Sequence, residues 1–200
     1  ISSVAPLSSL AGVARGASLD EIGDWVGRAP LNGLVAAALA AAASTAVALV
    51  AGHALARAER AGGIIDAVSV LAFLLPSSIL GVGLISAWNR PSTNWIYATT
   101  GILVVGYVAR YTAVATRVFA STVAQIPESL EQAARVGGSA YGRRLISVVA
   151  ALGRSGLAGA FALAFVFCLR DLEMAALYYP PGGEPLTVRI FTLEANGPPS

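Results

Sequence analysis

The sequence predicts an all-α fold, a polytopic bundle of transmembrane helices, and two observations carry this prediction. Hydrophobic residues make up 56% of the 200-residue chain and charged residues only 12%, with a mean hydropathy of +0.71. A soluble domain carries roughly 25% charged residues. The second observation is that long segments without any formal charge alternate with short charged ones. This composition excludes a disordered chain, a collagen-like chain and an ordinary soluble enzyme.

The uncharged segments locate the expected helices, since a spanning helix needs about 20 apolar residues. Three segments meet that length, at 31–56, 67–89 and 91–109. A shorter fourth span is expected at 154–169, where the side chain of Arg154 can extend to the membrane interface. The chain therefore forms one domain, 1–200, with about four spans. We expect it to be a fragment of a larger membrane protein that lacks a flanking span at each end.

The distribution of arginine predicts the orientation, because loops rich in Lys and Arg stay in the cytoplasm. All 13 basic residues are arginines. If segments 57–66 and 110–154 share one side, that side holds eight of them: Arg57, Arg60, Arg110, Arg117, Arg135, Arg143, Arg144 and Arg154. We therefore expect 110–153 to be a cytoplasmic segment and 1–30 and 170–200 to be outer loops.

The expected cytoplasmic segment contains a helix–glycine–helix pattern. Arg110 and Arg117 are seven residues apart, so the third span is expected to continue as a helix past them. A new helix starts near Pro127, Gly137-Gly138 ends it, and Ser139 is expected to cap a second short helix. A face of small apolar residues follows the first of these helices: Leu130, Ala133, Ala134 and Gly137. From the residues alone, two interpretations stand equal: an elbow that docks into a groove of another protein, and an amphipathic hairpin at the membrane surface.

No pattern in the sequence indicates catalysis, a cofactor or a metal site. There is no Ser/His/Asp set, no paired catalytic carboxylates and no Cys/His cluster, and Cys168 is the only cysteine. His53, the only histidine, lies near the cytoplasmic end of the first span. An intramembrane ionisable group is a functional candidate, but a histidine sharing a hydrogen bond at a helix terminus explains it more simply. We therefore expect this chain not to be an enzyme.

Residues 130–138, Leu-Glu-Gln-Ala-Ala-Arg-Val-Gly-Gly, resemble the EAA loop of the inner-membrane permease subunits of binding-protein-dependent ATP-binding-cassette importers. The family pattern is Glu-Ala-Ala, three residues, Gly, and nine residues later Ile-x-Leu-Pro. Gln132 stands at the glutamate of the motif, with Glu131 one position earlier, and Ala150-Ala151 replace the Leu-Pro. The resemblance implies that the contact with the ATPase is made by Glu131, Gln132, Ala133, Ala134 and Gly138.

The resemblance covers nearly the whole chain. The segment ending in Arg57 is similar to the first core helix of the family, and the segment with Pro76 is similar to its proline-bent next helix. Residues 169–173, Leu-Arg-Asp-Leu-Glu, with 179–182 and 186–191, resemble the ferric-iron and thiamine branch most closely. That branch carries an Arg–acid pair at this point, which implies an ion-paired outer gate formed by Arg170, Asp171 and Glu173.

The resemblance implies a permease in the bacterial inner membrane that moves a small solute from a periplasmic binding protein into the cytoplasm by alternating access. Its partners would be cytoplasmic ATP-binding subunits and a second permease half, in a homo- or heterodimer, and the path would be lined by 67–89, 91–109 and 154–169. Ferric iron is the favoured cargo, with thiamine or a phosphonate as alternatives. The other interpretation is an uncoupled channel or secondary transporter. Such a protein should show inverted repeats or intramembrane charge relays, and neither is visible in the sequence. A membrane scaffold with no transport role would leave the elbow without a purpose.

Overall fold

The computed structural model describes residues 27–58, 60–180 and 182–196, and within these ranges the regular secondary structure is helical, which confirms the all-α class. Most of the expected outer loop 1–30, and residues 197–200, lie outside the described residues. The α-helices are α3 (Ala29–Ala56), α4 (Arg60–Leu74), α5 (Ser77–Trp88), α6 (Asn94–Tyr97), α7 (Thr100–Val123), α8 (Glu128–Val136), α9 (Tyr141–Arg144), α10 (Arg154–Arg170), α11 (Leu172–Tyr178) and α12 (Leu186–Asn196). A 3-10 turn occupies Pro91–Thr93 and a π-helix occupies Leu145–Ala150.

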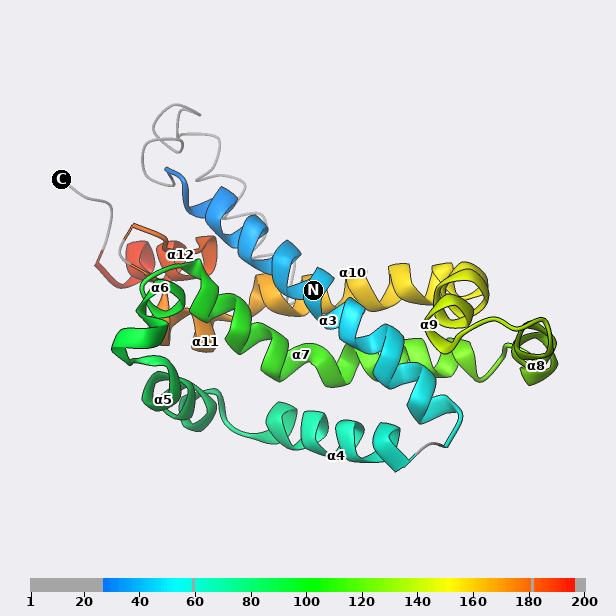
Figure 1. The fold of residues 1–200 in the computed structure, drawn as a ribbon. Helices are drawn as coiled ribbons and strands as arrows, with labels where there is room; N and C mark the ends of the chain where they lie inside the picture. The colour runs from blue at the N-terminus through cyan, green and yellow to red at the C-terminus, as the bar shows by residue number, and fades with distance from the viewer. Residues whose placement is uncertain (1–26, 59, 181, 197–200) are drawn as a thin grey trace, which may run out of the picture.

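The bundle is built around α7, which packs along α3, α10 and α4 (Figure 1). Helices α3 and α7 are each long and apolar enough to cross a membrane. Two further crossings are present if each bent helix pair, α4 with α5 and 141–150 with α10, counts as one span. The described residues thus contain two helices that could cross a membrane, and at most four such crossings, which is consistent with a membrane protein.

Small residues bring the central helices close together. Five alanines of α3 are fully buried: Ala36, Ala37, Ala40, Ala41 and Ala48. A methyl group added at Gly52 would lie 2.9 Å from the carbonyl oxygen of Thr116 and 3.1 Å from the Phe119 ring on α7. Membrane helices associate through such small-residue surfaces because apolar side chains gain little by leaving lipid. The alanine-rich first span is therefore a packing surface.

Replacing Gly52 by Leu is expected to separate α3 from α7 and to destabilise the protein. Overpacking a close contact costs about 1–3 kcal/mol, and here the obstacle is backbone, which cannot move aside easily. The thermal unfolding midpoint of the purified protein in detergent measures the effect. Gly63→Leu is the matched control, because Gly63 is an exposed helical glycine with no atom within 4 Å of an added methyl group. Equal midpoints for the two variants would contradict the packing role.

The expected span 67–89 is corrected by the structure to a broken helix. It begins at Arg60, ends at Leu74, and resumes as α5 from Ser77 after a bend of 110°. Pro76 lacks an N–H group and interrupts the helical hydrogen bonding, so a bend was expected, but its size prevents 67–89 from being one straight crossing. The carbonyl of Leu75 at the break accepts a hydrogen bond of 3.2 Å from Nη1 of Arg110.

The expected span 91–109 is corrected to α7, which starts at Thr100 and runs to Val123. The hydroxyl of Thr99 accepts a hydrogen bond from the N–H of Gly101 and caps the helix. The helix continues through Arg110 and Arg117, as their spacing predicted, and each arginine has a partner on another helix. Arg117 forms two hydrogen bonds of 3.0 Å with Asp66 on α4. Because the charges are paired, they do not mark the end of the helix.

The expected outer loop 170–200 contains two helices, while the expected span 154–169 agrees closely with α10 (Arg154–Arg170). Helix α11 packs against α5, and α12 packs against α3. Met174 and Ala175 on α11 and Val188 on α12 are buried. These apolar side chains turn the segment back onto the bundle, so it is part of the packed structure.

Candidate functional site

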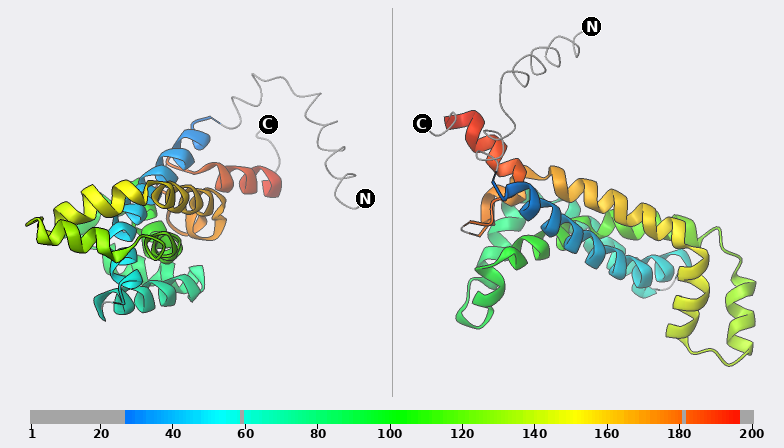
Figure 2. Two further views of the ribbon diagram at one scale, coloured as in Figure 1. Left: turned by 90° about the vertical axis from the view of Figure 1, so that its right-hand side faces the viewer. Right: turned by 90° about the horizontal axis from the view of Figure 1, so that it is seen from above.

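The segment 127–145, which we call the elbow, lies across one end of the bundle, opposite the end that holds α5, α6, α11 and α12 (Figures 1 and 2). Helix α8 follows Pro127 and has Glu128 and Glu131 in its first turn, where acidic side chains complement the helix dipole. Gly138 has φ +79°, and the N–H of Ser139 reaches back to the carbonyl of Ala134. The expectation that Gly137-Gly138 ends this helix is confirmed.

The second elbow helix is capped differently from the expectation. The N-cap position of α9 is Ala140, and no side chain caps it, so the predicted role of Ser139 is wrong. The carbonyl of Ser139 instead accepts a hydrogen bond of 2.9 Å from Nη1 of Arg144. This hydrogen bond links the last residue of α9 to the turn between α8 and α9.

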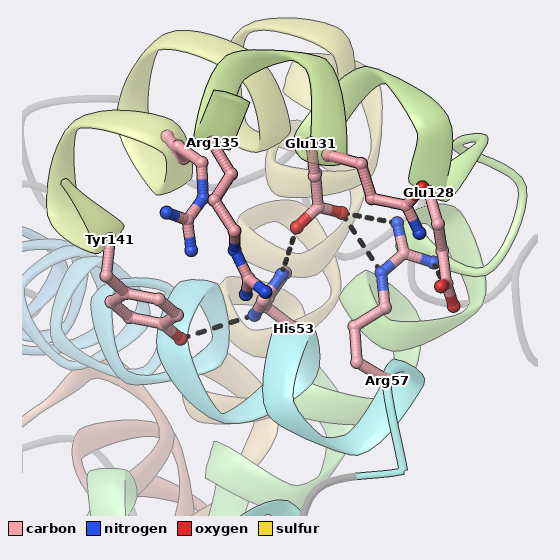
Figure 3. A pocket seen from close by; sticks show the side chains of 8 residues that line it. His53, Arg57, Glu128, Glu131, Arg135 and Tyr141 are labelled. Carbon is pink, nitrogen blue, oxygen red and sulfur yellow. Dashed lines mark hydrogen bonds and ion pairs between the residues drawn. The ribbon is translucent and has the colours of Figure 1, made fainter. Parts of the chain in front are cut away.

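Glu131 fastens α8 to the end of α3 (Figure 3). Its Oε2 lies 2.7 Å from Nε2 of His53, and its Oε1 accepts hydrogen bonds from Nε of Arg57 at 3.0 Å and from Nη2 of the same residue. Nη2 of Arg57 also donates to the carbonyl of Ile126 at 3.0 Å. The Glu131 side chain is only 15% exposed. In this chain Glu131 therefore holds the elbow in place and is not displayed on its surface.

His53 joins the elbow on a second side. Its Nδ1 lies 3.3 Å from the hydroxyl of Tyr141 on α9, and the two rings meet edge to face (Figure 3). From the sequence, a hydrogen bond at a helix terminus explained His53 more simply than a functional role. Its partners come from both helices of the elbow, so this histidine of α3 joins α3 to α8 and α9.

The electrostatics of this cluster favour the ionised carboxylate of Glu131. Burial alone would raise its pKa, but the hydrogen bonds and charges of His53 and Arg57 outweigh burial and lower it below the ordinary value for a glutamate. Beside the cluster lies a cavity of about 250 Å³, lined in part by Gln132, Arg135 and Arg144. The anchor is thus a charge-assisted contact at neutral pH.

The opposite side of α8 is exposed. None of the residues of α8 is buried, and the exposed fractions of Leu130 and Val136 are 45% and 90%. Ala133, Gln132 and Gly138 are exposed as well, and Ala134 is half-buried. This side of α8 is therefore not covered by the described part of the chain.

The expected ion pair between Arg170 and Asp171 is corrected by the structure. Asp171 is buried, its Oδ2 accepts a 2.5 Å hydrogen bond from Tyr111, and its Oδ1 accepts one of 3.0 Å from the N–H of Met174. The guanidinium paired with it is that of Arg110, whose Nε lies 3.9 Å from Oδ2. Arg170 stays on the last turn of α10, whereas Asp171 becomes the N-cap of α11 and turns inward. Arg170 and Glu173 are exposed.

The contact between Arg110 and Asp171 changes two expectations about the membrane region. Arg110 had been assigned to the cytoplasm and Asp171 to the outside, yet they meet roughly 15 Å from the start of α7, at 1.5 Å per residue. The sequence also showed no intramembrane charge relay, whereas the helices hold two charge pairs, Arg110 with Asp171 and Arg117 with Asp66. The remaining arginine excess is at the elbow end, so the predicted orientation does not depend on Arg110.

Replacing Asp171 by Ala is expected to lower stability strongly. The change leaves the Tyr111 hydroxyl and the Arg110 guanidinium without their carboxylate inside the bundle and removes the cap of α11. Breaking a buried pair in this way costs about 3–5 kcal/mol. The thermal midpoint in detergent reports it, with Glu173→Ala as the exposed control. Equal midpoints for the two variants would show that the contacts of Asp171 with Tyr111 and Arg110 do not stabilise the packing of α11 against α7.

In comparisons with known proteins, neither a protein-family model nor a curated protein matches the chain.

Proposed function

We propose that this chain is the transmembrane permease component of an ATP-binding-cassette importer. It moves a small solute from a periplasmic binding protein into the cytoplasm by alternating access, in the bacterial inner membrane. The observation that carries the proposal is the elbow: α8 is anchored to α3 on one side and exposes an apolar face on the other. This arrangement suits a docking helix that fits a groove of an ATP-binding subunit.

The anchor explains how movement of a docked ATPase would reach the bundle. Glu131 connects α8 to His53 and Arg57 at the end of α3, and α3 packs along both α7 and α10. A displacement of α8 is therefore transmitted to the central helices. The alternative, a hairpin that floats on the membrane surface, has no use for a rigid charged contact of this kind. A second permease half would complete the path.

One observation favours an uncoupled channel or secondary transporter instead. Two ion pairs join separate segments of the bundle, Arg110 with Asp171 and Arg117 with Asp66. Ionisable groups within a membrane bundle are candidates for ion and proton pathways. The two functions differ in their need for ATP. An uncoupled transporter has no ATPase, so the exposed face of α8 would have no such partner to contact. For the importer, the resemblance favours ferric iron as cargo, with thiamine or a phosphonate as alternatives.

The proposal is tested by purifying the chain together with an ATP-binding subunit of such an importer. Ala133→Glu places charge on the exposed face of α8 and is expected to reduce co-purification of the ATPase at least about tenfold, a loss of about 1.4 kcal/mol. Ala124→Glu, the same change at an exposed position just before the elbow, is expected to leave it intact. Equal co-purification of both variants, or ATP-independent uptake in proteoliposomes, would favour the uncoupled transporter.

A further inference from the structure

A cavity of about 440 Å³ lies where α4, α7, α10 and α11 meet, beside the contact of Arg110 with Asp171. Its lining comprises three aromatic, four charged and one aliphatic side chain: Phe73, Arg110, Tyr111, Phe167, Arg170, Asp171, Leu172 and Glu173. Arg110 and Asp171 are largely buried, whereas Arg170 and Glu173 are exposed. Ionisable side chains buried in a membrane bundle are costly and are candidates for functional sites. The volume is within the range of roughly 300–1,000 Å³ that small-molecule sites occupy.

The unused hydrogen-bond donors of this cavity belong to Arg110 and Arg170, and its unused acceptor is the exposed carboxylate of Glu173. Nε of Arg110 is buried and makes no hydrogen bond to the described part of the chain, and Nη1 alone reaches Leu75. Arg170 has no ion pair among the described residues. Asp171, in contrast, already accepts from Tyr111 and from the N–H of Met174. Arg110 and Arg170 therefore each retain N–H groups that have no partner among the described residues.

We propose that this cavity binds an oxyanion group of the transported solute, a carboxylate, phosphate or phosphonate, between Arg110 and Arg170. A planar guanidinium matches such a group with two parallel N–H···O bonds. The aromatic wall suits a small apolar remainder of the solute, because Tyr111 stacks on Phe167 at 5.6 Å and meets Phe73 edge to face at 6.4 Å. The lining holds two guanidinium groups and two carboxylates, and the carboxylate of Asp171 already accepts hydrogen bonds from Tyr111 and Met174. The unused guanidinium donors therefore favour the phosphonate alternative over a bare ferric ion or the cationic thiamine.

The proposed site lies beside the breaks in both bent helix pairs. Arg110 bonds the carbonyl of Leu75 at the break between α4 and α5, and it faces Asp171 at the break between α10 and α11. An anion held by Arg110 would therefore lie where both breaks meet the continuous helix α7. That the ligand is cargo depends on the proposed function, whereas binding of the anion does not.

Binding is tested by calorimetry on the purified full-length protein in phosphatidylcholine nanodiscs, without ATPase or binding protein. Methylphosphonate, inorganic phosphate and acetate are the probes, and thiamine is the cation control. We expect at least one oxyanion to bind, and thiamine not to. Arg170→Gln is expected to weaken that binding at least about tenfold, because it removes one of the two guanidinium groups that would bind the oxyanion. Arg170 forms no ion pair among the described residues, so its replacement is not expected to disturb the fold. Arg143→Gln, an exposed arginine on the elbow, is the control.

Absence of oxyanion binding, tighter binding of thiamine, or equal affinities of the two variants would overturn the proposal. Nanodiscs with phosphatidylglycerol separate cargo from lipid: if anionic lipid abolishes methylphosphonate binding, the occupant is a lipid headgroup and the proposal fails. The outcome is independent of the ATPase test. Failure of binding leaves the docking role of the elbow intact, and failure of ATPase co-purification leaves a measured anion affinity in place.

Discussion

Replacing Glu131 by Ala is expected to release α8 from the bundle and to abolish ATP-driven uptake. The change leaves the buried His53 and the nearly buried Arg57 without the carboxylate that joins them, and breaking such a contact costs about 3–5 kcal/mol when it is fully buried. Because the elbow is partly exposed, the protein is expected to insert and stay folded while α8 moves freely. Hydrogen exchange of the α8 amides and uptake in proteoliposomes measure the two effects.

Glu128→Ala is the matched control, since Glu128 lies one turn earlier, is 63% exposed and approaches Arg57 only to 3.8 Å. A surface pair of this kind contributes about 0–1 kcal/mol. Similar exchange and uptake in both variants would contradict the anchoring role. The pH dependence has a definite sign: because the pKa of Glu131 is lowered on folding, its stabilisation is present above the unfolded pKa and is lost as the pH falls through the folded one. The contribution of Glu131 to exchange protection is therefore expected to be lost only in acid.

The helices that the sequence located well are those whose ends coincide with real interruptions. The segment 31–56 agrees with α3 and 154–169 with α10, because in both cases the uncharged run ends where the helix ends. The other two were misplaced because a charge was taken as an end. Asp66 lies within α4 and Arg110 lies in the middle of α7, so in both cases the helix continues past the charge. A charge with a partner on a neighbouring helix is compatible with a spanning segment, and the partner cannot be identified from a count of charges.

The segment after residue 170 was read as a loop because glycine and proline at 180–183 dominate it. The apolar residues around Met174 form too short a run to span a membrane, and the length criterion therefore passed over them. A short helix that folds back onto the bundle needs only one buried face, which Met174 and Ala175 supply. A search for uncharged segments long enough to span a membrane does not detect such a helix.

At the elbow, local features were predictable and long-range ones were not. Gly138 has the left-handed conformation that its sequence context indicates, and the face of α8 with Leu130 and Ala133 is exposed. The partner of Glu131 is His53, 78 residues away, and no periodicity links the two. Neighbouring residues on a helix are separated by about 100°, at 3.6 residues per turn, so Glu131 and Gln132 point in different directions. That Glu131 faces α3 follows only from the tertiary structure.

Replacing Gly138 by Val is expected to abolish uptake without unfolding the protein. The φ of +79° at Gly138 is unfavourable for any residue with a Cβ by about 1–2 kcal/mol, and most of all for a β-branched one. An added methyl group would meet no atom within 4 Å, so the obstacle is the backbone conformation and not space. The chain is expected to relieve the strain by changing the angle between α8 and α9. That change separates Tyr141 from His53 and turns the exposed face of α8 away from an ATPase groove.

Uptake in proteoliposomes and co-purification of the ATP-binding subunit measure the result, with the amount of inserted protein as reference. Gly142→Val is the matched control, because Gly142 is exposed, also has open space around it, and lies in α9 with an ordinary helical φ. Gly138→Asn is expected to be intermediate, since asparagine tolerates the left-handed conformation better than valine does. If Gly138→Val transports as well as Gly142→Val, the angle of the elbow does not control coupling, and the exposed face of α8 must serve another contact.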